Sequence, residues 1–121
     1  MGNTEKESTA RTGCTTPSLD LVFELLADRR RRRALYYLHN LPDGVATVEE
    51  IAEYILTHDS ALAEVSEGRH QLMTALHHIH LPKLEEAGVI EHDARSQTVR
   101  YWTQPSLEEW LEHAYHKECV Q

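Results

Sequence analysis

Residues 66–102 read SEGRHQLMTALHHIHLPKLEEAGVIEHDARSQTVRYW, and this stretch decides the fold. Its first half repeats apolar residues at helical spacing, and Ser66 is a suitable N-cap for that helix. Gly88 stands where the helix must end, because glycine readily takes the left-handed conformation that closes a last turn. Residues 89–90 and 98–102 are predicted to form two strands joined by a polar turn. This is the order of a recognition helix followed by a wing.

The helix predicted over residues 66–81, and continuing toward the glycine, has two different sides at about 100° per residue. The apolar side carries the residues expected in the core, which are Leu72, Met73, Leu76, Ile79, His80 and Ala87. The polar side, on or beside which Glu85 also lies, offers amides, hydroxyls and imidazoles, groups that can pair with base edges in a DNA major groove. The candidate DNA-contacting residues of this helix are Arg69, His70, Gln71, Thr74, His77 and His78. The alternative is an exposed polar face that binds nothing.

In such a helix the residues of the first half normally contact the bases, which favours His70, Gln71 and Thr74. Farther along, Pro82 is predicted to bend the helix or to break one backbone hydrogen bond near His78, because proline has no N–H.

The histidines of this helix raise the question of a metal site. His77 and His80 are three residues apart, but His80 points to the apolar side and His78 points away from it. Zinc normally takes four ligands, and no Cys, Asp or Glu at a suitable spacing completes a set. We therefore predict no metal and no other cofactor, and we expect His80 to be a core imidazole bonded to a backbone carbonyl.

Two helices are predicted upstream. Ser18 can cap the first, and the second runs from Asp28 to about Leu41, either separate from the first or continuous with it. The second begins with five consecutive arginines, of which Arg29, Arg32 and Arg33 share its polar side. These three either form a solvated face paired with carboxylates or clamp a DNA phosphate, and the sequence favours neither.

The remaining elements complete a winged helix-turn-helix domain over residues 18–104. Thr47 and Glu50 form a capping box, which starts the first helix of the helix-turn-helix. The wing over residues 93–100 contributes Arg95 in its turn and Arg100 in its strand as further candidate DNA contacts. At the hairpin tip an arginine that only aids solubility is an equally good explanation.

The C-terminal segment, residues 105–121, is predicted to be an additional helix with one apolar stripe. The stripe consists of Leu107, Trp110, Leu111, Ala114 and Tyr115. Such a helix packs either on its own domain or against a second copy of the chain. A stripe centred on tryptophan suits a two-fold contact, so these residues are the candidate dimerisation residues of a homodimer.

Length, net charge and cysteine positions limit the classes of protein to which the chain can belong. The chain has 121 residues, enough for one domain, and its net charge is −8, the wrong sign for an ordinary DNA-binding protein. No apolar run is long enough to cross a membrane, and no signal peptide is apparent. Cys14 and Cys119 lie near opposite ends without metal-ligand spacing, so free thiols in a cytoplasmic protein are expected over an intersubunit disulfide. Residues 1–17 are polar and are expected to be a disordered tail.

Two stretches carry a resemblance to known proteins. LHHIHLPKLEEAGVIEHD (residues 76–93) and LDLVFELLADRRRRRALYYL (residues 19–38) resemble a haloarchaeal winged-helix family whose members are mostly domains of unknown function. LEEAGVIE (residues 84–91) is also similar, more distantly, to the end of the recognition helix in metal- and stress-responsive winged-helix repressors. The resemblance covers residues 18–103. It implies a winged-helix fold, and an acidic surface adapted to very high salt, where attraction to phosphate is screened.

Two functions are compatible with these features. The first is a dimeric transcription regulator that binds double-stranded DNA through the 66–81 helix, with the wing in support. The second is a winged-helix module that binds another protein and not DNA, which the acidic composition favours. No phosphate-binding loop, nucleophile elbow or metalloprotease motif is present, so no catalytic residues are predicted. The sequence indicates no effector.

Overall fold

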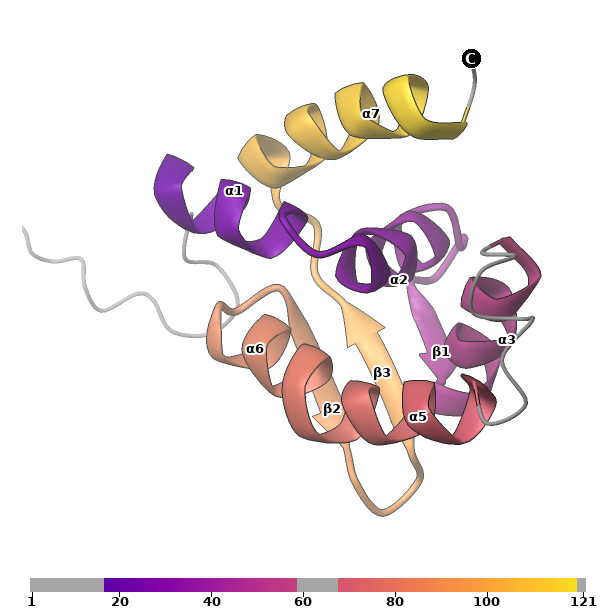
Figure 1. Ribbon diagram of the computed structural model, residues 1–121. Helices are drawn as coiled ribbons and strands as arrows, with labels where there is room; N and C mark the ends of the chain where they lie inside the picture. The colour runs from indigo at the N-terminus through magenta and orange to yellow at the C-terminus, as the bar shows by residue number, and fades with distance from the viewer. Residues whose placement is uncertain (1–16, 59–67, 120–121) are drawn as a thin grey trace, which may run out of the picture.

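The computed structural model describes residues 17–58 and 68–119, and within them the fold is mainly helical with one small sheet (Figure 1). The elements in chain order are α1 (Leu19–Leu26), α2 (Arg29–His39), β1 (Val45–Thr47), α3 (Val48–His58), α5 (Gly68–Ala75), the π-helical turn η2 (Leu76–His80), α6 (Leu81–Glu86), β2 (Ile90–Asp93), β3 (Thr98–Tyr101) and α7 (Pro105–Cys119). The predicted fold class is thereby confirmed, namely a mainly α winged helix-turn-helix with extra helices at both ends. The predicted tail before Pro17, Ser66 as a cap, and Cys14 lie outside the described residues.

Short-range signals place the helix starts where the sequence suggested. The Ser18 hydroxyl accepts the N–H of Leu21 at 3.1 Å, and Thr47 and Glu50 each accept the other's backbone N–H. Asp28 has extended backbone and accepts the N–H of Arg30 at 2.8 Å. Because this cap begins a new helix, α1 and α2 are two helices, which settles the question left open by the sequence.

The wing is an antiparallel sheet in the order β1-β3-β2. Its inner face buries Ala46, Ile90, Val99 and Tyr101 against the helices. Its outer face, which pairs Glu91 with Arg100, has no helix over it in Figure 1. The sheet therefore acts as one wall of the core and presents its tip at the same end of the molecule as α5.

The predicted recognition helix is interrupted by a wider turn. In η2 the N–H of Leu81 bonds to the carbonyl of Leu76, five residues back instead of four. Pro82, which lacks an N–H and whose ring would crowd the carbonyl of His78, follows directly. The irregularity predicted at Pro82 thus takes the form of a π-helical turn.

The wider turn changes which side chains face inward. His80 is 1% exposed, but Ile79 is 53% exposed, so the prediction that Ile79 belongs to the core is wrong. A π-helical turn contains more residues than an α-helical one, and the rule of 100° per residue fails beyond Leu76. The helix then ends at Gly88, whose φ is +83°, as the sequence predicted.

Candidate nucleic-acid interface

The first half of the recognition helix presents an exposed polar face. Arg69, His70, Gln71 and Thr74 all lie on the surface of α5, and His78 extends the face into η2. In Figure 1, α5 and the hairpin tip lie at the bottom of the molecule, and α7 lies at the top across α1 and α2. The C-terminal helix therefore does not cover the residues predicted to contact DNA.

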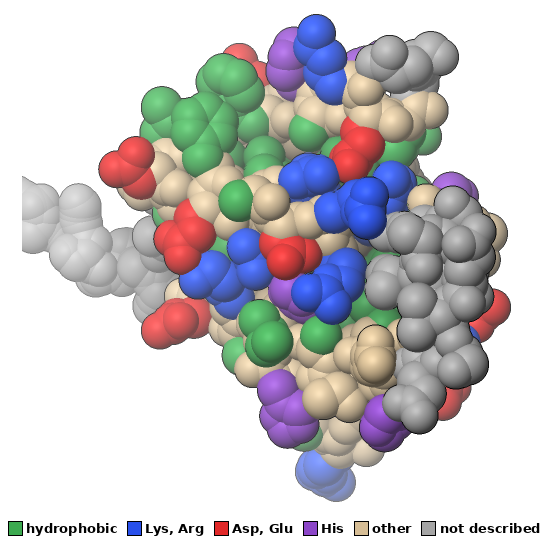
Figure 2. Space-filling view, viewed as in Figure 1, with side chains coloured by type: hydrophobic (Ala, Val, Ile, Leu, Met, Phe, Trp, Pro, Cys, Tyr) green, Lys and Arg blue, Asp and Glu red, His purple; other side chains and the backbone are tan. Residues whose placement is uncertain are grey.

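The charge of this surface differs from that of the whole chain. Residues 68–83 contain Arg69, Lys83 and four histidines but no carboxylate, although the chain has 20 acidic residues among 121. Figure 2 shows the area over α5, in the lower part of the view, mainly in tan and purple, with acidic side chains around it. Arg69 is held by Glu53 of α3, with Nη1 and Oε1 at 2.6 Å. This stretch of helix thus carries no carboxylate of its own, but both of its cations are paired with acidic residues of neighbouring elements, because Lys83 Nζ also lies 2.6 Å from Oε2 of Glu24 on α1.

His77 lies beside the wing and not at the centre of this face. It is half-buried, and its ring centroid lies 6.0 Å from that of His92 on β2. His77 is therefore the predicted contact that the structure places between helix and wing.

The two wing arginines lie in different surroundings. Arg95 is exposed in the hairpin turn, where its backbone N–H donates to the Asp93 carboxylate at 3.0 Å. Arg100 lies on the outer sheet face, with its guanidinium carbon 5.7 Å from the centroid of the Trp102 ring. The structure brings Arg95, but not Arg100, to the hairpin tip.

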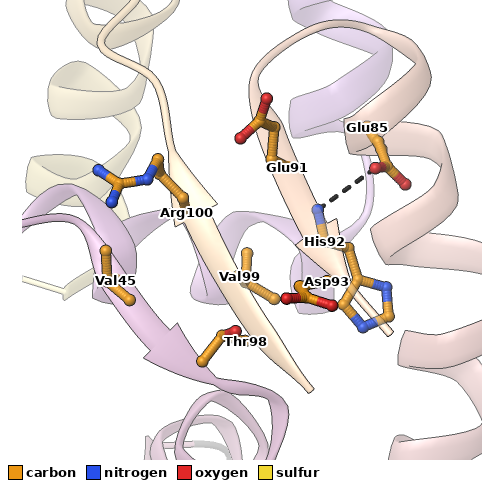
Figure 3. A pocket seen from close by; sticks show the side chains of 8 residues that line it. All are labelled: Val45, Glu85, Glu91, His92, Asp93, Thr98, Val99 and Arg100. Atoms are coloured by element: carbon orange, nitrogen blue, oxygen red, sulfur yellow. Dashed lines mark hydrogen bonds between the residues drawn. The ribbon is translucent and has the colours of Figure 1, made fainter. Parts of the chain in front are cut away.

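A hollow of about 470 Å³ adjoins Arg100 (Figure 3). Its lining consists of Val45, Glu85, Glu91, His92, Asp93, Thr98, Val99 and Arg100. Three carboxylates in this lining repel a phosphate. These carboxylates oppose a phosphate contact by Arg100, whose role in DNA binding stays a prediction.

Arg32 and Arg33, for which the sequence left a phosphate clamp and pairing with carboxylates both open, are paired with a carboxylate within the chain. The Glu118 carboxylate of α7 accepts Nε and Nη2 of Arg32 at 3.0 and 2.8 Å, and Nη2 of Arg33 lies 3.9 Å from it. The Tyr36 hydroxyl donates to the same carboxylate at 2.8 Å. Both guanidinium groups therefore hold α7 on α2, and of the three arginines predicted for the clamp Arg29 is the most exposed one.

The Glu118 cluster makes stability depend on pH. Bonds from Arg32, and less strongly from Tyr36 and Arg33, lower the pKa of Glu118 from 4.5 to about 2. A carboxyl group with a lowered folded-state pKa stabilises the fold fully above the unfolded value, and this stabilisation is lost as the pH falls from 4.5 toward 2.

We expect Glu118→Gln to lower the free energy of unfolding by about 1–2 kcal/mol at pH 7, because a partly exposed charged hydrogen-bond pair is lost. At pH 3 the difference from the wild type should shrink, since the Glu118 carboxyl of the unfolded wild-type chain is then protonated while that of the folded chain is still ionised. Urea unfolding at pH 7, 5 and 3 measures this, with Glu109→Gln on the exposed side of α7 as the control. An equal difference at all three pH values would contradict the assignment.

A buried polar network joins α1, α2 and η2. Arg31 is 7% exposed, and it donates to the carbonyls of Leu25 and Glu24 at 3.0 and 2.8 Å. Its Nη1 lies 3.3 Å from Nδ1 of His80, and Nε2 of His80 lies 3.9 Å from Asp28. Because a guanidinium can only donate, Nδ1 of His80 is the acceptor of this contact, and burial lowers the pKa of the ring.

This network corrects one prediction and adds a residue that the sequence analysis missed. His80 is a core imidazole, but its partner is a guanidinium and not a backbone carbonyl. Arg31 lies four residues before the buried Leu35 and three before Ala34, and this spacing was the available signal that Arg31 points inward.

The predicted dimerisation stripe of α7 packs largely within the chain. Leu107 and Leu111 are buried in the domain's own core, which rules them out as contacts to a second copy in this arrangement. The Tyr115 ring packs edge-on against Tyr36, and Ala114 lies half-buried against the same core. Trp110 remains 38% exposed, with its ring 5.2 Å from that of Phe23. Only Trp110 keeps the exposed apolar surface that a dimer contact requires.

Metal binding and membrane insertion are two further possibilities to test against the described part of the chain. Within residues 17–58 and 68–119, no three His, Cys, Asp or Glu side chains lie close enough together to hold a metal ion. In the same residues, no helix combines the length and apolar character needed to span a bilayer.

Comparison with known proteins places the chain in a family. No curated protein and no solved structure matches it. The model of a domain of unknown function, DUF7344, matches residues 23–100, which run from α1 into β3 and make up more than half of the chain. The chain therefore belongs to the DUF7344 family.

Proposed function

We propose that the protein is a cytoplasmic transcription regulator that places the exposed face of α5 in the major groove of double-stranded DNA. The observation that supports this most is the absence of carboxylates from residues 68–83, in a chain with a net charge of −8. Such an absence is expected of a surface that binds DNA, because each carboxylate there would face phosphates.

The chemistry of the face fits base recognition. The amide of Gln71 can pair with two edge atoms of adenine, and the Thr74 hydroxyl can donate to or accept from any base. His70 and His78 add imidazole donors on the same exposed side. In this proposal Arg69 and Arg95 supply phosphate contacts at the two margins, and Arg69 either leaves Glu53 or shares its guanidinium with a phosphate.

The acidic remainder of the surface limits how DNA approaches. Carboxylates around the outer sheet face repel the backbone of a duplex, so α5 and the hairpin tip are the approachable surface. An acidic surface also agrees with the proposed haloarchaeal origin. In very high salt counterion release contributes little, so hydrogen bonds and shape would supply most of the affinity.

We also propose that the regulator is a homodimer. Leu19 and Phe23 on α1 and Trp110 on α7 are exposed large hydrophobic residues, and the Phe23 and Trp110 rings are in contact. Figure 2 shows an apolar area at its upper left, where α1 and the start of α7 lie in Figure 1. A second copy packed there would leave α5 uncovered in both copies. Two reading helices then fit two half-sites spaced by about 34 Å along the duplex.

We expect Phe23→Glu to convert the dimer to a monomer, because a buried, unpaired carboxylate opposes association. Sedimentation velocity at matched concentrations measures the change. Ile79→Ser is the control, since it removes an equally exposed apolar side chain from another element and should leave the dimer intact. A wild-type chain that sediments as a monomer at every concentration would contradict the dimer.

Selection from a pool of randomised duplexes tests DNA binding. The full-length chain should enrich one sequence motif in high-salt buffer, and fluorescence anisotropy should then show tighter binding to that motif than to a scrambled duplex. No enrichment, with the chain folded, would overturn the proposal.

One observation favours a second function. The hollow beside the wing has Glu85, Glu91 and Asp93 in its lining, which suits a basic segment of another protein. In that case the chain would be a winged-helix interaction module, and the duplex selection would give no motif.

A further inference from the structure

Ile79 is an exposed apolar side chain on the proposed reading helix. Five large hydrophobic residues are exposed in the described part of the chain. Four of them lie beside another apolar, aromatic or cationic side chain. Phe23 and Trp110 touch one another beside Leu19, and Trp102 lies under Arg100. Ile79 is the one that α5, η2 and α6 present to solvent, at 53% exposure.

An irregular turn in the helix places the Ile79 side chain at the surface. A continuous α-helix would put residue 79 in line with Leu72 and Leu76, which are fully buried. The π-helical turn buries His80 instead, where it meets Arg31, and turns Ile79 out. π-Helical turns inside α-helices are found frequently at functional sites.

The surroundings of Ile79 match those of the reading face. Its exposed neighbours along the helix include His78 and Pro82, and no carboxylate occurs in the sequence between Gly68 and Lys83, although Lys83 is itself paired with Glu24 of α1 at 2.6 Å. A β-branched side chain on a helix is held in one main rotamer, so it can present a methyl surface in a fixed position. In the major groove, the apolar feature that such a surface can meet is the C5 methyl group of thymine.

We propose that Ile79 is a specificity-determining residue, which contacts the C5 methyl group of a thymine in the bound duplex. This inference rests on the proposed function and adds a base preference to it. The operator should then carry a fixed thymine, displaced along the groove from the bases that Gln71 and Thr74 contact.

Substituting deoxyuridine for thymine tests the contact directly, because it removes the methyl group and leaves every hydrogen-bonding atom of the base pair in place. Each thymine of the selected duplex is replaced in turn, and affinity is measured by anisotropy. For the wild type we expect a roughly fourfold loss at one or two positions, the size expected for one buried methyl group. At the same positions Ile79→Ala should bind the thymine and uracil duplexes equally.

Two controls separate this contact from a general weakening. Ile79→Val keeps a β-branched methyl surface and should retain sensitivity to uracil. Gln71→Ala should bind more weakly at every position yet remain as sensitive to uracil as the wild type. Because Ile79 is exposed, its substitution should leave the midpoint of thermal unfolding unchanged.

The outcomes distinguish the inference from the function on which it rests. If a motif is selected but Ile79→Ala remains as sensitive to uracil as the wild type, the Ile79 contact is wrong and DNA binding stands. If no position responds to uracil, the contact is equally wrong. If Ile79→Ala changes the sedimentation coefficient and not the affinity, Ile79 serves a contact between protein chains. If no motif is selected, the function and the inference both fail.

Discussion

Replacing Gln71 and Thr74 together by alanine is expected to reduce affinity for the selected duplex by about 100-fold or more. Each polar side chain that pairs with a base edge contributes about 1–3 kcal/mol of discrimination, and the double variant loses two such contacts. Both side chains are exposed on α5, and alanine is the best helix former, so the domain should stay folded.

The measurement is anisotropy with the selected and the scrambled duplex in the same high-salt buffer. The affinity for the selected duplex should fall and the affinity for the scrambled duplex should not change, because Arg69 and Arg95 still contact phosphates. Thr103→Ala, an exposed threonine between β3 and α7, is the matched control and should bind like the wild type. Unchanged affinity of the double variant would exclude α5 as the reading helix.

Arg31→Ala should have the largest effect on stability, lowering the free energy of unfolding by about 3–5 kcal/mol. The guanidinium satisfies two carbonyl groups at the end of α1 and the Nδ1 atom of His80, and alanine leaves all three without that donor in the core. The substitution also leaves a cavity between α1, α2 and η2.

Urea unfolding followed by circular dichroism measures this loss. Arg95→Ala, an exposed arginine in the hairpin turn, is the control and should change stability by about 0.5 kcal/mol or less. Arg31→Lys should fall between them, since one ammonium group cannot reach all three acceptors in the geometry of a planar guanidinium. If Arg31→Ala were as stable as Arg95→Ala, the network would have no role in holding α1 to η2.

The parts of the fold that could be predicted depend on neighbouring residues. Ser18, the Thr47–Glu50 pair and Gly88 act over three or four residues, and each operates at the expected position. The reading face was predictable for the same reason, because α5 from Gly68 to Ala75 is a regular α-helix whose sides follow from spacing alone.

The parts that could not be predicted depend on partners far apart in the chain. Arg32 and Glu118 are 86 residues apart, and Arg31 and His80 are 49 apart, so nothing local selects these pairs. A block of five arginines cannot reveal which of its members lies against the core. Ile79 was misplaced because the wider turn arises where Pro82 and the buried His80 must both be accommodated.

The wing and the last helix are mechanically connected. The backbone runs directly from β3 into α7, and the Tyr101 hydroxyl at the end of the strand donates to Glu108 at 3.0 Å. His39 of α2 lies 3.6 Å from the same carboxylate. A displacement of the hairpin tip, such as contact with a duplex would cause, would therefore be transmitted to α7 and to the exposed Trp110. For the proposed DNA-binding dimer, thermodynamic linkage would then require the reverse, so that stronger association between two copies changes the affinity of each one for its duplex.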